Sequence, residues 1–457
     1  MSEQRDLREV SKDCVHCGFC LPACPTYQLW GEEMDSPRGR IHLVNQVLEG
    51  APVTAAAASH FDRCLGCMAC MTACPSGVQY DVLIEAARTW TEDPSAAPAP
   101  SAPSASPASP ASSAEPAPSG EPPWRRPTLE RVTRTVIFSV FPYPRRLRAA
   151  TAPLRVAQRT GVDRWLARSG LAARVSPTAE AALRLAPPAS GLTGRLPARV
   201  AARGTRRAVV GMLTGCVQSV FFPGVNTATA RVLAAEGCDV VIPRGQGCCG
   251  ALSLHSGRSA QAARLAKATI TAFEKAGVDA IVVNSAGCGS AMKEYARMLA
   301  AEPSWAARAA ALSAKVRDLS EFLAALGPVA ERHPLPVTAA YHDACHLGHA
   351  QRITRQPRDL LRAIPSLKLV EVPDAGTCCG SAGVYNLLQP EAARELGARK
   401  AHSVAGAGAS LLVSANPGCT LQISAALAES GRSIATAHTA EVLDASIRGL
   451  RPSWAAR

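Results

Sequence analysis

The residues most clearly suited to chemistry are cysteines in a four-cysteine run that occurs twice near the N-terminus. The first run comprises Cys14, Cys17, Cys20 and Cys24, and the second comprises Cys64, Cys67, Cys70 and Cys74. A proline follows the last cysteine of each run, as Pro25 and Pro75. Both runs have the C-x₂-C-x₂-C-x₃-C-P spacing typical of bacterial proteins that bind two [4Fe-4S] clusters.

This spacing also predicts which cysteines share a cluster. The short spacers let three thiolates of one run surround one cluster, and the fourth cysteine ligates the cluster of the other run. We therefore expect two [4Fe-4S] clusters with the ligands Cys14, Cys17, Cys20 and Cys74 for the first, and Cys24, Cys64, Cys67 and Cys70 for the second. Two zinc sites are the alternative, but zinc sites pair C-x₂-C arms and do not need this doubled run. Two neighbouring clusters would conduct electrons. The motif does not identify the electron donor or the electron acceptor.

A second cysteine pattern is repeated in the C-terminal half. Each copy has one cysteine, then a Cys-Cys-Gly motif, then one further cysteine. The first copy comprises Cys216, Cys248, Cys249 and Cys288, and the second comprises Cys345, Cys378, Cys379 and Cys419. Because the spacing recurs almost unchanged, we expect each set to hold a further iron–sulfur cluster or zinc, or to form a redox-active thiol pair. Cys238 has no counterpart and is predicted to pack in the core.

Several polar side chains near these sets could hydrogen-bond to the thiolates without binding a metal themselves. The candidates are His255, His342, Asp343, His346 and Asn386. A catalytic Cys–His pair at Cys345 is the alternative, and we favour the supporting role. No residue is predicted to be catalytic.

The elements that must position the repeated cysteines read as strands alternating with helices. Apolar strands are expected at 206–213, 239–243, 280–284, 337–341, 367–373 and 410–415, with helices at 260–276 and 390–404. Alternation of this kind predicts parallel βαβ units, in which ligands gather at the carboxyl ends of the strands. The expected fold is multidomain α+β and α/β, with a ferredoxin-like domain followed by a duplicated α/β cysteine-rich domain.

Composition divides the 457 residues into five segments. They are a two-cluster domain at 1–91, a Pro/Ala/Ser-rich linker at 92–123, a basic helical segment at 124–204, and Cys-Cys-Gly domains at 205–330 and 331–457. The 17 cysteines are an odd number, and the N-terminus has no apolar signal core, so reduced thiolates in the cytoplasm are expected. The net charge of +13 and the basic segment suit an anionic membrane surface or a solvated helix face. No recognised nucleic-acid-binding motif accompanies the charge, so we expect no nucleic-acid partner.

These motifs together resemble the iron–sulfur subunit of glycolate oxidase, within a superfamily that includes subunits for lactate and glycerol-3-phosphate oxidation and heterodisulfide reductase. The similar stretches are Cys14–Gly50, which includes Asp35–Ile41, and also Tyr341–His346 and Asn416–Gln422. The sequence differs from heterodisulfide reductase in ending each set with a single cysteine.

The resemblance implies a subunit that does not oxidise glycolate alone. Flavin-binding partner subunits would convert glycolate to glyoxylate, and this chain would pass the electrons towards the quinone pool from the inner face of the cell membrane. We identify no G-x-G-x-x-G that opens a βαβ unit as a dinucleotide site and no phosphate loop, which agrees with hydride chemistry elsewhere; the one such spacing, Gly245–Gly250, encloses Cys248 and Cys249. The alternatives are an equivalent subunit for lactate or glycerol-3-phosphate oxidation, or a heterodisulfide-reductase-like thiol–disulfide enzyme.

Overall fold

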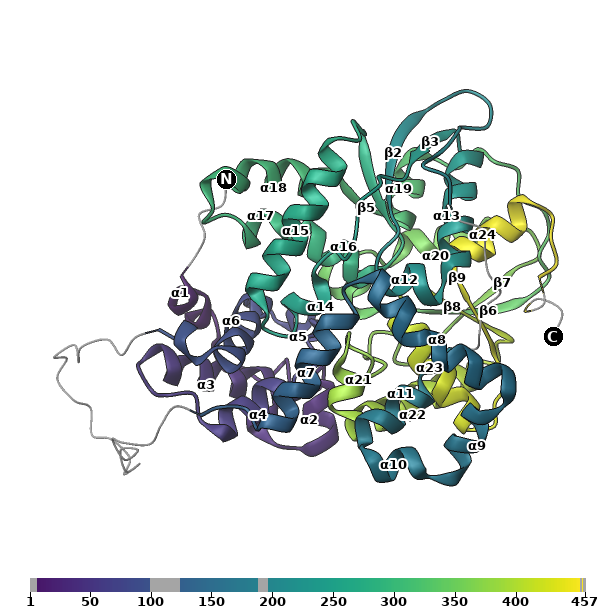
Figure 1. Cartoon of the computed structure of the whole chain (residues 1–457). Helices are drawn as coiled ribbons and strands as arrows, with labels where there is room; N and C mark the ends of the chain where they lie inside the picture. The colour runs from purple at the N-terminus through teal and green to yellow at the C-terminus, as the bar shows by residue number, and fades with distance from the viewer. Residues whose placement is uncertain (1–5, 99–123, 188–195, 453, 455–457) are drawn as a thin grey trace. The chain divides into compact units, whose positions relative to one another are not determined.

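The computed structural model describes residues 6–98, 124–187, 196–452 and 454 (Figure 1). Most of the predicted linker at 92–123 therefore lies outside the described residues. Contacts divide the chain into two compact units. Unit 1 comprises Met1–Gly66, Cys70–Arg134 and His255–Arg258, and unit 2 comprises Cys67–Ala69, Thr135–Leu254 and Ser259–Arg457.

Unit 1 is built from short helices whose starts are set by proline and by caps. The helices are α1 (Leu7–Lys12), α2 (Pro25–Trp30), α3 (Pro37–Leu48), α4 (Ala55–Arg63), α5 (Ala69–Ala73), α6 (Tyr80–Glu92) and the start of α7 (Thr128–Val140). Pro25 turns the end of the first cysteine run directly into α2, because a proline is tolerated in the first helical turn. Ser36 caps α3 by accepting a hydrogen bond from the Gly39 amide.

Buried ion pairs join α7 to the other helices of unit 1. Arg126 and Arg134 both contact Asp62 of α4, with Arg126 Nη2 2.9 Å and Arg134 Nη2 3.2 Å from Asp62 Oδ1. Arg134 also pairs with Glu92 of α6 at 3.1 Å. The first residues of the predicted basic segment at 124–204 thus lie within unit 1, where their charges are neutralised.

Unit 2 contains two sheets, and the four strands of the second follow the order of four parallel strands of the first. The first sheet has the order β1 (Arg199–Val200), β3 (Cys238–Val241), β2 (Ala208–Leu213), β4 (Ala280–Val283), β5 (Val316–Asp318). The second has the order β7 (Lys368–Glu371), β6 (Thr338–His342), β8 (Leu411–Ser414), β9 (Ala435–His438). Apart from the antiparallel β1–β3 pair, all described pairs are parallel. The α/β prediction is confirmed, although β1, β5 and β9 were not predicted.

The two repeats pack through corresponding helices. Helix α13 (Pro223–Ala235) of the first repeat packs on α24 (Thr439–Ile447) of the second. The reciprocal pair is α20 (Arg355–Arg362) on α19 (Leu319–Leu326). Since α13 and α20 follow the corresponding strands β2 and β6, and α19 and α24 follow the last strands β5 and β9, the interface is pseudo-symmetric.

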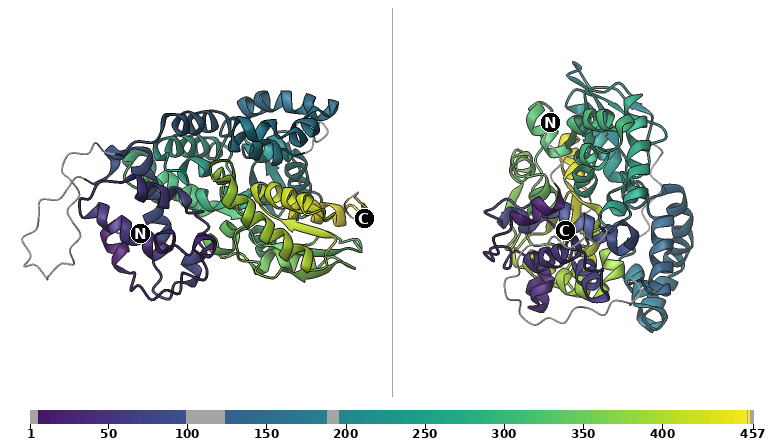
Figure 2. Two further views of the ribbon diagram at one scale, coloured as in Figure 1. Left: turned by 90° about the horizontal axis from the view of Figure 1, so that it is seen from below. Right: turned by 90° about the vertical axis from the view of Figure 1, so that its left-hand side faces the viewer.

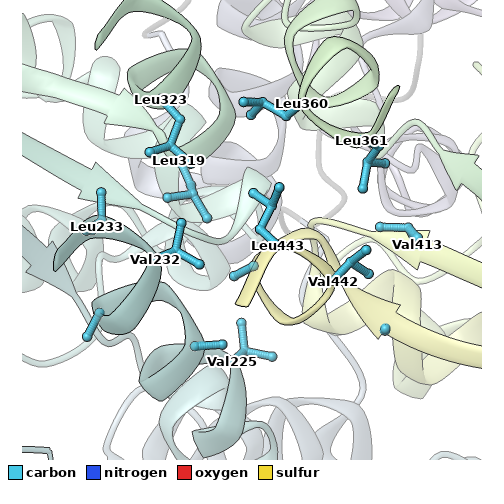
Figure 3. Close-up of a cluster of buried hydrophobic side chains, with 14 of the residues drawn as sticks. Val225, Val232, Leu233, Leu319, Leu323, Leu360, Leu361, Val413, Val442 and Leu443 are labelled. Atoms are coloured by element: carbon cyan, nitrogen blue, oxygen red, sulfur yellow. The ribbon is translucent and has the colours of Figure 1, made fainter. Parts of the chain in front are cut away.

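This interface holds the largest apolar core of unit 2. Figure 3 shows Leu443 of α24 between side chains from the other three helices, including Val232, Leu319 and Leu361. All four leucines and valines are essentially inaccessible to solvent. Burial of whole Leu or Val side chains contributes about 1.5–3 kcal/mol each, so the repeats form one core.

The remaining helices of unit 2 surround the sheets or form a separate layer. Those around the sheets are α12 (Val217–Phe221), α14 (Ala251–Leu254), α15 (Ser259–Glu274), α16 (Ala286–Lys293), α17 (Tyr295–Met298), α18 (Pro303–Lys315), α21 (Tyr385–Leu388), α22 (Pro390–Gly406) and α23 (Pro417–Glu429). The layer comprises α8 (Pro144–Thr160), α9 (Val162–Ser169), α10 (Leu171–Val175) and α11 (Pro177–Arg184), in blue in Figure 2. It packs on α12 of one repeat and on α21 of the other. Among the described residues, no helix combines the length and apolar character that crossing a bilayer requires.

The Asp62 ion pairs predict a large loss of stability when their acceptor is neutralised. Burial raises the pKa of Asp62, but the hydrogen bond from Arg126 and the charge of Arg134 outweigh it, so the pKa is lowered. Asp62→Asn is expected to cost about 3 kcal/mol, because two buried arginines lose one of their anionic partners at the same time. A urea titration of the whole chain without oxygen, followed by circular dichroism, measures this loss.

The matched control is Glu130→Gln, since the Glu130 side chain pairs with the same arginines but is 39% exposed. It should cost less than about 1 kcal/mol. The contribution of Asp62 is present above its unfolded pKa of about 3.9 and is lost as the pH falls through its lower folded pKa. Equal urea midpoints for the Asn and Gln variants would contradict this account of the network.

Candidate metal centres

The four cysteines predicted to share the first cluster converge on one cavity in unit 1. Cys14, Cys17, Cys20 and Cys74 all line this cavity, and so does Cys70, which is predicted to bind the other cluster. Cys74 reaches it from the second run. The cavity thus brings together the thiols predicted for the first cluster, which fits the thiolate ligation of an iron–sulfur cluster.

The two runs also share an unusual backbone conformation. Positive φ angles occur at the third and fifth positions of each, at His16 (53°) and Gly18 (84°) in the first and at Gly66 (61°) and Met68 (62°) in the second. Each loop thus uses one glycine and one residue that rarely adopts this conformation. The same strained loop built twice from different residues supports a common ligand-binding role.

The members of the second predicted set are buried. Cys24, Cys64 and Cys70 belong to unit 1, whereas Cys67 is grouped with Met68 and Ala69 in unit 2. The Cys64 sulfur accepts hydrogen bonds from the Gly66 amide at 3.3 Å and from the Tyr80 hydroxyl at 3.6 Å. The Cys24 sulfur lies 3.2 Å from the Thr26 hydroxyl.

A buried arginine supplies the positive charge that these thiolates need. The Arg40 side chain is 1% exposed and donates to the Thr26 hydroxyl at 3.1 Å. Burial alone would raise the pKa of Cys64, but the charges of Arg40 and Arg88 outweigh it, so the pKa is lowered. The site therefore favours the thiolate form that binds iron.

Asp35 holds Arg40 in place. Its fully buried carboxylate accepts from Arg40 at 3.2 Å, from His60 at 2.9 Å and from Arg63 at 3.0 Å. The sequence stretch Asp35–Ile41 was recognised only as part of a resemblance, and its electrostatic role was not predicted. A sequence signal existed, because Asp35 and Arg40 are charged residues close to the first run, but their burial could not be read from it.

The first Cys-Cys-Gly set gathers at the carboxyl edge of the first sheet. Cys216 follows β2, and its sulfur lies 3.4 Å from that of Cys248. Hydrogen bonds among neighbouring thiols, together with burial, raise the pKa values of Cys248, Cys249 and Cys288. Thiols in this environment are poor nucleophiles unless a metal displaces their protons.

The second Cys-Cys-Gly set occupies the corresponding edge of the second sheet. Cys345, Cys378, Cys379 and Cys419 are all buried. Metal-binding atoms of His342, Cys379 and Cys419 lie within 4.8 Å of one another. The first turn after Cys345 is a π-helix at His346–Ala350, a rare form that is frequent at functional sites.

The other residues predicted to support these sets have varied surroundings. The His346 Nδ1 atom lies 3.6 Å from the Cys345 sulfur, which places it beside the set. Asp343 instead pairs with Arg358 at 2.7 Å, and Asn386 donates to Gln422 at 3.2 Å. His255 belongs to unit 1, where its Nδ1 atom lies 3.5 Å from Glu85. Of these four residues, His346 contacts a cysteine of its set, whereas the contacts given for Asp343, Asn386 and His255 are to other side chains.

Lys400 of α22 was not predicted and lies beside the second set. It is 3% exposed, and its ammonium donates to the Asp374 carbonyl at 2.7 Å. Burial lowers its pKa, while the negative charges of Cys379, Cys378 and Cys419 act in the opposite direction. Lysine is rare in this sequence, with only seven lysines among 49 basic residues, and this rarity could have drawn attention to Lys400.

Comparison with known families agrees with the positions of these sites. A 4Fe-4S dicluster domain matches residues 10–78, and a cysteine-rich domain matches 210–293 and again 339–424. The linker region of the glycolate oxidase iron-sulfur subunit matches residues 129–186. The chain is 36% identical over 469 aligned positions to a probable glycolate oxidase iron-sulfur subunit of Bacillus subtilis, covering 97% of this chain and 98% of that one. The chain belongs to the family of glycolate oxidase iron–sulfur subunits.

Two further relatives show how far the likeness extends. The glycolate oxidase iron-sulfur subunit of Escherichia coli is 34% identical, covering 91% of this chain and 90% of that one. Lactate utilization protein A of Shouchella clausii is 31% identical over 51% of this chain and 98% of its own length. The family resemblance and the iron–sulfur character predicted from the motifs are thus confirmed, while the individual ligand assignments stay predictions.

The exchange of the fourth ligand between the runs can be tested by pairs of substitutions. Cys14→Ser and Cys74→Ser should each lower the iron content from about eight to about four per chain, because each removes a ligand of the same cluster. The double variant should lose no more than either single variant. Cys14→Ser combined with Cys24→Ser should lose both clusters.

Anaerobic iron and sulfide analysis measures these contents, and Cys238→Ala is the matched control. Cys238 lies in β3 within the apolar core, and burial raises the pKa of its thiol to about 11. Its removal should leave the iron content unchanged. If the Cys14→Ser/Cys74→Ser double variant lost both clusters, the prediction that each run supplies the fourth ligand of the other cluster would be disproved.

Arg40 should raise the reduction potential of the second cluster. Reduction adds a negative charge, which a nearby buried cation stabilises. Arg40→Met should therefore lower one midpoint potential on the order of 60 mV, which is a tenfold change for a one-electron couple. Arg40→Lys keeps the charge and should restore most of the shift. Redox titration followed by electron paramagnetic resonance separates this effect from loss of the cluster, and equal shifts for Met and Lys would exclude a role of charge.

Proposed function

We propose that this chain is the iron–sulfur electron-transfer subunit of a glycolate oxidase complex. In this proposal, flavin-binding subunits oxidise glycolate to glyoxylate, and the chain passes the electrons towards the quinone pool. Two [4Fe-4S] clusters carry the electrons, with the ligand sets given above. The observation that supports this proposal most strongly is the cavity on which Cys14, Cys17, Cys20 and Cys74 converge, in a chain that belongs to this family.

The surroundings of the thiols favour electron transfer over thiol–disulfide chemistry. The raised pKa values of Cys248, Cys249 and Cys288 leave these thiols protonated in the absence of a metal. A thiol–disulfide enzyme needs a lowered pKa and an accessible thiolate. An additional iron–sulfur cluster or redox site at the Cys-Cys-Gly sets stays a prediction, to be tested by iron above about eight per chain.

We further propose that the helical layer α8–α11 makes the contact with the inner face of the cytoplasmic membrane. Val162 and Trp165 of α9 are 50% and 61% exposed and stand three residues apart, on one face of the helix. Exposed arginines of α8, such as Arg148 and Arg159, lie near them in sequence. Apolar side chains beside basic ones suit the surface of an anionic bilayer.

Reconstitution of the purified complex tests the function. The chain alone should not turn over glycolate. The chain with its flavin-binding subunits should reduce a soluble dye, and it should reduce quinone when vesicles of anionic lipid that contain quinone are added. Glycolate turnover by the isolated chain, or full quinone reduction by the flavin subunits without it, would disprove the subunit role.

A variant of α9 separates the membrane contact from electron transfer. Val162→Ser combined with Trp165→Ser should slow the reduction of quinone in vesicles several-fold and leave reduction of the soluble dye unchanged. Val329→Ser is the matched control, because Val329 is 64% exposed but lies outside the helical layer. Equal rates of quinone reduction in vesicles for the wild type, the α9 double variant and Val329→Ser would exclude this layer as the membrane contact. Replacing glycolate with lactate or glycerol 3-phosphate in the same assay distinguishes the alternative substrates.

A further inference from the structure

The two Cys-Cys-Gly sites can be compared residue by residue because their sheets have the same register. Leu213 pairs with Val283 at the end of β2 and β4, and His342 pairs with Ser414 at the end of β6 and β8. Leu213 and His342 each lie three residues before the first cysteine of their set. The first site therefore has Leu213 and Val283 where the second has His342 and Ser414.

At two further positions the second repeat again has the more polar residue. After the Cys-Cys-Gly motif, the first repeat continues with Ala251 and the second with Ser381. The helices that follow approach Gly250 and Gly380 through Ala262 and Ala393. Seven residues further along these helices, the first repeat has a threonine at 269 and the second has the buried Lys400.

These differences leave unpartnered polar atoms around the second site. Both ring nitrogens of His342 are buried without a hydrogen-bond partner, and so are the hydroxyls of Ser381 and Ser414. His342 is only 1% exposed. A buried polar group without a partner destabilises the fold. Four such atoms beside the same cysteines are explained if the site binds a ligand.

His342 can act as a metal ligand in its present form. Neither ring nitrogen of the buried imidazole has a hydrogen-bond partner, so a nitrogen lone pair is available to a metal ion. That nitrogen and the sulfurs of Cys379 and Cys419 lie within 4.8 Å of one another. A tetrahedral zinc ion with bonds of about 2.0–2.3 Å requires ligands spaced at about 3.5–3.8 Å. A cubane distributes its ligands over separate irons and needs them further apart.

We infer that His342, Cys379 and Cys419 bind a single divalent ion of the zinc class, with Cys378 as the nearest further thiol. The Cys378 thiol hydrogen-bonds with Cys379, which places it beside the same three ligands. At the corresponding position of the first repeat, Leu213 packs in the same apolar cluster as Cys249, and among the described residues only the second repeat brings a histidine and two cysteines together in this way.

Charge balance supports this inference. A divalent ion with three thiolates and a neutral imidazole has a net charge of −1, and four thiolates would give −2. The ammonium of Lys400 beside these cysteines supplies the remaining positive charge. A buried site with no net charge avoids most of the desolvation cost that a buried anion would carry.

The inference is independent of the proposed electron-transfer function, since zinc does not change its oxidation state. The test uses the full chain, purified without oxygen, with zinc and iron analysis and X-ray absorption at the zinc edge. We expect one zinc per chain, bound by sulfur and one nitrogen. His342→Leu, which installs the residue of the first repeat, should lose the zinc and keep the iron.

His342→Cys distinguishes ligation from packing. It should retain the zinc, with the nitrogen signal replaced by sulfur. The matched controls are Leu213→His, at the equivalent position of the first repeat, and His402→Leu, an exposed residue of α22, and neither should change the zinc content. Wild-type protein without zinc, zinc bound by sulfur alone, or loss of iron instead of zinc in His342→Leu would each overturn the inference. If His342→Leu fails to fold, the His342→Cys spectrum still decides.

Discussion

The constraint on which this structure depends is the burial of many thiolate sulfurs in a protein interior. A buried anion without compensation costs several kcal/mol. Unit 1 meets this requirement with Arg40, which Asp35 holds beside Cys24 and Cys64. The hydrogen bonds of Gly66 and Tyr80 to Cys64 act in the same sense. The helices around the cysteine runs can therefore be understood as a scaffold that places fixed positive charge and donors beside sulfur.

Unit 2 meets the same requirement in two ways. Around the first Cys-Cys-Gly set the surroundings are mostly apolar, and hydrogen bonds between the thiols themselves keep them protonated. Around the second set, Lys400 contributes a buried positive charge, and His342 contributes an uncharged imidazole with a nitrogen lone pair. Both sets lie at the carboxyl edge of a parallel sheet, where the fold collects the ends of several strands. The shared framework thus supports two different chemical environments.

Much of this arrangement could be predicted from the sequence, because the signals were periodic or repeated. The cysteine spacings identified the iron–sulfur family, and alternating strands and helices predicted the parallel sheets. The strands β1, β5 and β9 were missed, because their sequences (RV, VRD and ATAH) lack the longer apolar runs that mark β2, β4 and β8. The roles of Arg40 and Lys400 could not be predicted, because burial of a charged side chain depends on packing between distant segments. The equivalence of Leu213 and His342 is visible in their spacing from the first cysteine, but the burial of the unpartnered imidazole is not.

The pseudo-symmetric packing of α13 on α24 and of α20 on α19 has a consequence for how the two Cys-Cys-Gly sites can differ. Reciprocal packing of this kind is the geometry of a twofold homodimer. In a homodimer both subunits come from one gene, so every substitution near one site appears at the other. Here the two halves are joined in one chain, and each position can change alone. The covalent link between the repeats is what allows a leucine at one strand end and a histidine at its counterpart.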